Sequence, residues 1–271
     1  MVAEVNYMKK LSGLLILIFT IFMLASCQSN EVPNTWAEIE ERGYIIVGLD
    51  DTFAPMGFRN DDGDLVGFDV DLAKAVGELL GVEVRFQPID WDSKVLELNA
   101  GTIDMIWNGL TITDSRLEEM SFSNAYLANS QIVITRKDST IDTVNDLIGK
   151  KVGVQISSAS EDAVSASSIF DQLDEFVKYD TFNLALLDLS SGTIDAVVID
   201  EIMGRYVISQ TNDLYQVATE NFGVETYGVG FRLASTDIRD QINQALQTLV
   251  SNGSAATISN AWFGEDIILI S

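Results

Sequence analysis

The sequence LNAGTID at residues 98–104 returns as LSSGTID at residues 189–195, and this repeat decides the fold. Each copy follows a helical pattern and leads into an apolar run. Further upstream, the strand-like segment IVG at residues 46–48 is echoed by KVGV at residues 151–154. Both halves of the chain therefore repeat one strand–helix plan, which predicts two similar α/β lobes. The alternative is chance recurrence of a common helix-to-strand turn.

The first half shows the plan most clearly. Residues 44–49 (YIIVGL), 82–86 and 103–107 are typical of buried strands. Between them we expect a helix capped by Asp69 that runs to Leu80 and ends at Gly81, and a shorter helix over residues 92–99. The segment NDDGD at residues 60–64 predicts a hairpin turn.

The carboxyl ends of the strands indicate where a ligand would bind. Open α/β sheets bind ligands at this edge. Asn108 and Gly109 in the first half, and Ile199 and Asp200 in the second, follow corresponding strands. We therefore expect a ligand site lined from both lobes.

Composition excludes several classes of function. The 271 residues include 41 Asp and Glu against 16 Lys and Arg, a net charge of -25 that disfavours nucleic acid as a partner. The chain has no histidine, which excludes Ser-His and Cys-His nucleophile pairs and histidine-ligated zinc. Phosphate-binding-loop and EF-hand patterns are also missing from the sequence. We expect no catalytic residue, metal or cofactor.

The N-terminus has the features of a processed leader. Lys9 and Lys10 precede an apolar run at residues 11–24, which is short for a membrane span. The run ends in LASC at residues 24–27, which resembles the lipobox of bacterial lipoprotein signal peptides. This resemblance implies a signal peptide over residues 1–26, lipidation of Cys27 and a polar tether over residues 27–35. An uncleaved anchor with an incidental cysteine is the alternative.

Several segments together resemble the family 3 solute-binding proteins of polar amino acid ABC transporters. They are VGLDDTFAPM at 47–56, GFDVDLA at 67–73, LTIT at 110–113 with Arg116, and WFG at 262–264. The resemblance covers residues 36–267. It implies a two-lobed, periplasmic-binding-protein-like type II α/β fold that closes over a free amino acid.

The same resemblance implies boundaries for the lobes. Lobe 1 would comprise residues 36–130 and 228–271, and lobe 2 residues 135–223. Two crossings, at residues 131–134 and 224–227, would form the hinge.

The resemblance also assigns an end of the site to the ligand's α-carboxylate. Arg116 occupies the position that clamps it, where a guanidinium can bind a carboxylate through two hydrogen bonds; the alternative is a surface ion pair. Gly109 and Thr111 would supply backbone and hydroxyl hydrogen bonds. Asn108 would contact the α-ammonium or cap a strand end.

The resemblance also implies a role for Asp200, which matches the family's acid that binds the α-ammonium of the ligand. A helix N-cap is the alternative role. An acid that ends an apolar strand is unfavourable unless it is paired, which supports the binding role. Ser158 and Ser160 lie in a helix-start loop that would meet the carboxylate; plain helix capping is the alternative for them too.

The side chain of the ligand would meet a third group of residues. Phe53 and Trp91 occupy positions that sandwich it, and the acids that flank Trp91 suit a half-exposed wall. Asp50 would recognise its far end. Trp107 is expected in the core.

The resemblance thus implies a binding subunit, extracytoplasmic and anchored by lipid to the bacterial membrane, that delivers a polar amino acid to a permease driven by an ATPase. We expect a monomer. Arginine, glutamine and cystine remain open as ligands. Two alternatives are a cyclohexadienyl-dehydratase-like enzyme on the same fold, and the sensor domain of a receptor that would continue into a transmembrane helix.

Overall fold

The computed structural model describes residues 35–211 and 213–270. The predicted signal peptide, Cys27 and residues 28–34 of the tether lie outside the described residues. Within the described ranges, no helix combines the length and the apolar character that crossing a membrane requires.

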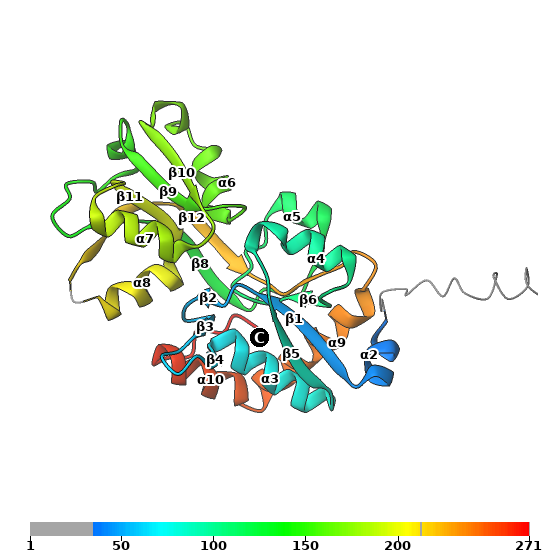
Figure 1. Ribbon diagram of the computed structural model, residues 1–271. Helices are drawn as coiled ribbons and strands as arrows, with labels where there is room; N and C mark the ends of the chain where they lie inside the picture. Colours follow the sequence, from blue (N-terminus) through cyan, green and yellow to red (C-terminus); the bar gives the residue numbers. More distant parts are fainter. Residues whose placement is uncertain (1–34, 212, 271) are drawn as a thin grey trace, which may run out of the picture. The chain divides into compact units, whose positions relative to one another are not determined.

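The first of two five-stranded sheets has the strand order β5-β1-β6-β13-β7. Strands β5, β1 and β6 of this sheet are labelled in Figure 1. Strand β1 pairs in parallel with β5 and β6, whereas β13 pairs antiparallel with β6 and β7. We call this sheet with its helices lobe 1. Its strands are β1 (Tyr44–Leu49), β5 (Glu83–Pro88), β6 (Met105–Ile106), β7 (Ser121–Phe122) and β13 (Gly230–Phe231).

Lobe 1 carries helices from both ends of the described chain, and α3, α9 and α10 pack against one another. The helices are α2 (Trp36–Arg42), α3 (Phe68–Leu80), η1 (Trp91–Ser93), α4 (Lys94–Ala100), α5 (Asp114–Glu119), α9 (Thr236–Ser251) and α10 (Ser254–Phe263). A small antiparallel sheet consists of β2 (Thr52–Phe53), β3 (Gly57–Arg59) and β4 (Leu65–Val66), and it contains the predicted hairpin.

The second sheet has the order β10-β9-β11-β8-β12, and with its helices it forms lobe 2 (Figure 1). Strand β9 pairs in parallel with β10 and β11, and β8 runs antiparallel to β11 and β12. The strands are β8 (Leu127–Arg136), β9 (Lys151–Gln155), β10 (Glu175–Tyr179), β11 (Ala196–Asp200) and β12 (Tyr215–Tyr227). The helices are η2 (Val144–Leu147), α6 (Ala159–Ser165), η3 (Phe170–Gln172), α7 (Phe182–Ser191) and α8 (Glu201–Gln210).

The repeated motif forms the same turn in both lobes. Gly101 ends α4 at φ 74°, and Gly192 ends α7 at φ 80°, left-handed conformations that favour glycine. Asp104 then bonds to Ile46 of β1, and Asp195 bonds to Lys151 of β9, in each case through backbone and carboxylate. The repeat is therefore structural, and each copy joins a helix to the strand beside the first strand of its lobe.

Both faces of each sheet are covered. In lobe 1, Ile45 and Val47 of β1 pack into one apolar cluster, whereas Ile106 of β6 packs into another that includes Trp91. Strands that are buried on both faces have nearly continuous apolar sequences, and the sequence shows this pattern. Trp107 is 1% exposed and lies in the core, as expected.

Strands β8 and β12 are the long strands around the predicted hinge. Residues 224–227 of β12 pair with residues 127–130 of β8. Residues 131–134 of β8 pair with β11, with Gln131 opposite Asp200. The register of β12 shifts between Val217 and Val224, so the strand is irregular just before the crossing.

Candidate functional site

Residues from both lobes line a small cavity of about 10 Å³, which we call the enclosed site because most of its lining residues are buried. Seven of the ten predicted ligand-binding residues line it, so the chain brings together positions 147 residues apart in sequence, from Phe53 to Asp200. The lining residues are Phe53, Trp91, Gly109, Thr111, Arg116, Gln155, Ser158, Ala159, Phe182 and Asp200.

Arg116 is held at the start of α5. The hydroxyl of Thr113 caps this helix by accepting from the Arg116 backbone N–H at 3.2 Å. The side chain is 5% exposed, with Nη1 donating to the Thr111 carbonyl at 2.9 Å and Nη2 to the Ser157 carbonyl at 3.1 Å. Burial lowers the pKa of Arg116 from its ordinary value. A buried guanidinium with free N–H groups remaining is suited to bind an anion.

The backbone conformation and the neighbouring side chains at Gly109 leave no room for a larger residue. Its φ of 58° favours glycine, and a Cβ there would lie 2.8 Å from Cε1 of Phe53. Its N–H donates to Oδ2 of Asp69 at 2.7 Å, and the Tyr126 hydroxyl donates to the same oxygen at 2.9 Å. The prediction that Asp69 caps the helix is wrong, because Gly67 is the N-cap and Asp69 supports Gly109 from a buried position. Burial raises the pKa of Asp69 to about 7.

Asp200 ends β11 and is 5% exposed. Its Oδ1 accepts from Asn129 Nδ2 at 2.7 Å, from Gln131 Nε2 at 3.0 Å and from the Tyr227 hydroxyl at 2.8 Å. It is also the N-cap residue of α8, but its side chain makes no capping hydrogen bond. Burial, and then the negative charge of Glu225, raise the pKa of Asp200 to about 7.

Aromatic side chains form the apolar walls. The rings of Phe53 and Phe182 have centroids 6.0 Å apart. Trp91 is 7% exposed, so the expectation of a half-exposed wall is wrong. Lys94 covers it, with Nζ 5.0 Å from the ring centroid. That Nζ donates to the carbonyls of Trp91 at 3.0 Å and Ser157 at 2.8 Å, and burial, followed by the charge of Arg116, lowers the pKa of Lys94 to about 7.

The two predicted serines differ in position. Ser158 lines the enclosed site and caps α6 by accepting from the Glu161 N–H at 3.1 Å. Ser160 is fully buried and does not line the enclosed site. Its hydroxyl donates to Oε1 of Gln131 at 2.5 Å, which orients the Gln131 amide toward Asp200.

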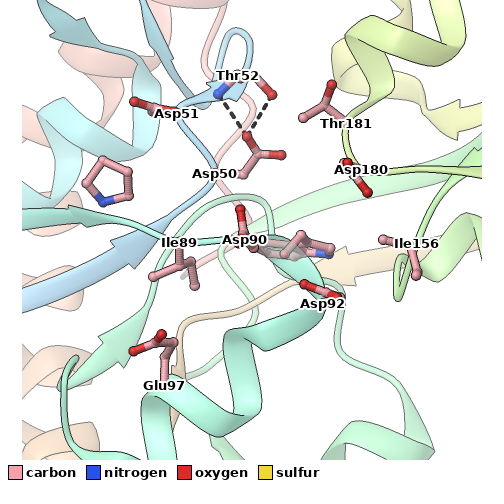
Figure 2. Close-up of a pocket in the computed structure, with 12 residues that line it drawn as sticks. Asp50, Asp51, Thr52, Ile89, Asp90, Asp92, Glu97, Ile156, Asp180 and Thr181 are labelled. Atoms are coloured by element: carbon pink, nitrogen blue, oxygen red, sulfur yellow. Dashed lines mark hydrogen bonds between the residues drawn. The ribbon is translucent and has the colours of Figure 1, made fainter.

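A larger cavity of about 510 Å³ also has Trp91 in its wall (Figure 2). We call it the acidic cavity, because half of its twelve lining residues are acids and none is basic. Figure 2 shows Asp50 bonded to Thr52 on one side, with Asp180 and Thr181 of lobe 2 across from it. The lining acids are Asp50, Asp51, Asp90, Asp92, Glu97 and Asp180.

Asp50 is the buried acid of this cavity, at 6% exposure. Its Oδ1 accepts from the Thr52 N–H at 2.9 Å and hydroxyl at 2.7 Å, and its Oδ2 accepts from Gln155 Nε2 at 2.7 Å. The last bond joins lobe 1 to lobe 2. Asn108 supports Asp50 from behind, since its Oδ1 accepts from the Asp50 N–H at 3.1 Å, but it lines neither cavity.

Three lining residues of the enclosed site were not among the predicted ones: Gln155, Phe182 and Ala159, which lies between the two predicted serines. The internal repeat could have indicated Gln155, because aligning Gly153 with Gly48 places it opposite Asp50. Phe182 follows the helix cap Thr181, and no motif in the sequence marked it.

Comparison with known proteins identifies the family. Residues 45–265 match the family model of bacterial extracellular solute-binding proteins, family 3. The match spans most of the chain, and the chain belongs to this family. The predicted resemblance is therefore confirmed.

Individual relatives agree with this assignment. The chain is 33% identical to the L-cystine-binding protein TcyJ of Escherichia coli K12, over 85% of this chain and 86% of that protein. It is 29% identical to the arginine-binding extracellular protein ArtP of Bacillus subtilis 168, over 94% and 98%. These relatives are binding proteins rather than enzymes, as expected for this chain.

A solved structure supports the fold. The crystal structure of an ABC uptake transporter substrate-binding protein from Streptococcus pneumoniae with bound histidine superposes with a TM-score of 0.83. It is 41% identical and covers 86% of this chain and 98% of that one. The predicted two-sheet α/β fold of periplasmic amino acid-binding proteins is confirmed.

Proposed function

We propose that this chain is the substrate-binding subunit of an amino acid ABC transporter, and that it captures a polar α-amino acid between its two lobes. The observation that carries the proposal is the placement of Arg116 from lobe 1 and Asp200 from lobe 2 in one enclosed site. A buried cation and a buried acid from opposite lobes suit a zwitterion, which bridges the lobes only when they are close together.

In this proposal Arg116 binds the α-carboxylate and Asp200 the α-ammonium. Gly109, Thr111 and Ser158 complete the polar lining, and Ser160 acts through Gln131. Phe53, Phe182 and Trp91 pack against the aliphatic part of the ligand. Asn108 positions Asp50 and does not contact the ligand itself.

The acidic cavity supports a ligand whose side chain carries positive charge. A side chain that passes Trp91 reaches Asp50, the buried carboxylate, with five more acids around the cavity. Buried charges are screened by solvent less than exposed ones, so Asp50 contributes most to this preference. The proteins of known ligand among the relatives bind cystine, arginine or histidine, and we propose arginine before cystine and glutamine here.

The remaining parts of the proposal concern assembly. Lipid on Cys27 would hold an acidic protein at the membrane surface, which its own charge does not favour. The protein would act as a monomer that delivers its ligand to a permease coupled to an ATPase. We place lobe 1 at residues 36–130 and 228–271 and lobe 2 at residues 135–223, with the hinge in the crossings of β8 and β12.

The test is calorimetry of the mature chain with L-arginine, L-lysine, L-histidine, L-glutamine and L-cystine. At least one should bind, and its des-amino and amidated analogues should fail. Arg116→Ala or Asp200→Asn should weaken binding by about 2 to 5 kcal/mol, because the opposite ligand charge stays desolvated and unpaired. That is about thirtyfold to several thousandfold in Kd.

Arg205→Ala is the matched control, since it removes a guanidinium that pairs with Glu201 on the surface of α8. Its Kd should stay within about threefold of wild type. Tight binding of a des-amino analogue, or Kd values for Arg116→Ala and Asp200→Asn as close to wild type as the control, would contradict the assignment.

A further inference from the structure

Two carboxylates meet at the ammonium end of the enclosed site. Asn129 Nδ2 donates to Oδ1 of Asp200 at 2.7 Å and to Oε1 of Glu225 at 2.5 Å. Gln131 Nε2 donates to the same two oxygens, at 3.0 Å and 2.8 Å. Two amide groups therefore bridge Asp200 in lobe 2 to Glu225 in β12, at the crossing between the lobes.

The bridged oxygens receive further donors from both sides. The Tyr227 hydroxyl donates to Asp200 Oδ1 at 2.8 Å, and the Thr111 hydroxyl donates to Glu225 Oε1 at 2.7 Å. The second oxygen of each carboxylate takes part in none of these bonds. Neither carboxylate belongs to an ion pair in the described part of the chain.

Asp200 is 5% exposed and shares two amide donors with Glu225, and a buried carboxyl beside a second carboxylate ionises less readily than an isolated one. Burial is the first cause that raises the pKa of Asp200 to about 7, and the charge of Glu225 is the second. Arg116 acts in the opposite direction, but its guanidinium donates to backbone carbonyls. Tyr227 remains protonated, because burial raises its pKa well above the usual value.

Other charged groups near Asp200 are already paired or act on Arg116. Glu201, next in the chain, pairs with Arg205 on α8. From α6, Glu161 pairs with Lys178, and Asp162 acts on Arg116. Glu225 is therefore the acid that couples to Asp200.

We propose that Asp200, beside Glu225, carries a proton in the ligand-free protein, and that the ammonium group of the ligand displaces it. The step breaks one carboxyl O–H bond and transfers the proton to water or buffer. The ammonium then takes its place as the positive charge beside two ionised carboxylates. Glu225 is a positioning residue, because it acts through the charge of Asp200. This inference rests on the proposed function in placing the ammonium at Asp200.

The direction of proton transfer on binding distinguishes displacement of a proton from Asp200 from protonation of Lys94. Binding should release a proton and weaken as the pH falls below about 7. Lys94, whose pKa is also about 7, would give the opposite result. A ligand carboxylate that stabilised the charged form of Lys94 would make binding take up a proton. The α-ammonium and α-carboxylate of L-arginine do not titrate between pH 5.5 and 8.

The first experiment needs no ligand. Carboxyl ¹³C NMR of the ligand-free chain should show one carboxyl titrating near pH 7, lost in Asp200→Asn and shifted to lower pH in Glu225→Gln. Glu220→Gln is the matched control, because Glu220 also lies in β12 but caps Val144 at an exposed position. If no carboxyl titrates above pH 6, or if Glu225→Gln leaves that titration unchanged, the proposed proton on Asp200 beside Glu225 is refuted.

The second experiment is calorimetry with L-arginine and L-cystine at pH 5.5 to 8, in two buffers of different ionisation enthalpy. Wild type and Glu220→Gln should release a proton and lose about tenfold or more in affinity between pH 7.5 and 5.5. Glu225→Gln should release less and lose under about threefold. Binding without proton release would overturn the inference. Failure of every amino acid to bind would instead overturn the proposed function, and the NMR titration would still decide whether Asp200 carries a proton in the ligand-free protein.

Discussion

Asp50→Asn should change which amino acid the protein prefers while keeping the hydrogen bonds that Thr52 donates to residue 50. The asparagine Oδ1 can still accept from the Thr52 N–H and hydroxyl, which hold Asp50 at 2.9 Å and 2.7 Å. What is lost is the buried negative charge that faces the acidic cavity.

The magnitude follows from this burial. A hydrogen bond to a charged group contributes about 1.5 to 3 kcal/mol, so arginine should bind about tenfold to 150-fold more weakly. Glutamine, whose side-chain amide carries no charge, should change by less than about threefold. Isothermal calorimetry with both ligands measures the ratio directly.

The ratio also removes an ambiguity. Gln155 donates to Oδ2 of Asp50 across the lobes, so the substitution can alter lobe closure. A change in closure affects every ligand equally and cancels in the ratio of arginine to glutamine. Asp51→Asn is the control, since Asp51 lines the same cavity but is partly exposed and paired with Arg59. Equal losses for arginine and glutamine would refute the role assigned to Asp50.

Two further predictions concern the leader and the core. Cys27→Ala should yield a protein without lipid, measured by membrane fractionation and mass spectrometry, and a mutant that stays firmly integral would mean that residues 11–24 are an anchor. Asp69 has a pKa raised from 3.8 to about 7, so its contribution to stability is lost as the pH rises through that window, by up to about 4 kcal/mol. Urea unfolding at pH 4.5 and 7.5 should show this loss of unfolding free energy in wild type and in the control Asp64→Asn, and a much smaller loss in Asp69→Asn. An equal loss in all three proteins would contradict the prediction.

The features that sequence predicted best depend on local physics. Gly101 and Gly192 adopt left-handed conformations because a helix must turn back into a strand there, and the Asp that follows bonds to the neighbouring strand in both lobes. The same local rules placed Gly81 at the end of α3. Aligning the two halves in this way also placed Asp200 at a strand end that lines the site.

The features it missed depend on tertiary contacts. The sequence around Trp91 is acidic, yet the ring is covered by Lys94, which reaches over it to the Ser157 carbonyl of lobe 2. Ser160 and Asn108 have polar side chains that suit a ligand, but the Ser160 hydroxyl donates to Gln131, Oδ1 of Asn108 accepts from the Asp50 N–H, and neither residue lines the enclosed site. No local pattern states which partner a polar side chain will find once the lobes are folded.

Recognition of the ligand separates into two parts that lie in different cavities. In the proposed function, Arg116 and Asp200 meet groups common to all α-amino acids, so substitutions there should weaken every ligand. Asp50 lines the acidic cavity and not the enclosed site, so its charge acts on the part of the ligand that differs between amino acids. Glu225 belongs to the first part, because it acts through Asp200. It follows that Glu225→Gln should change the pH dependence of all ligands alike, whereas Asp50→Asn should change their order at any pH.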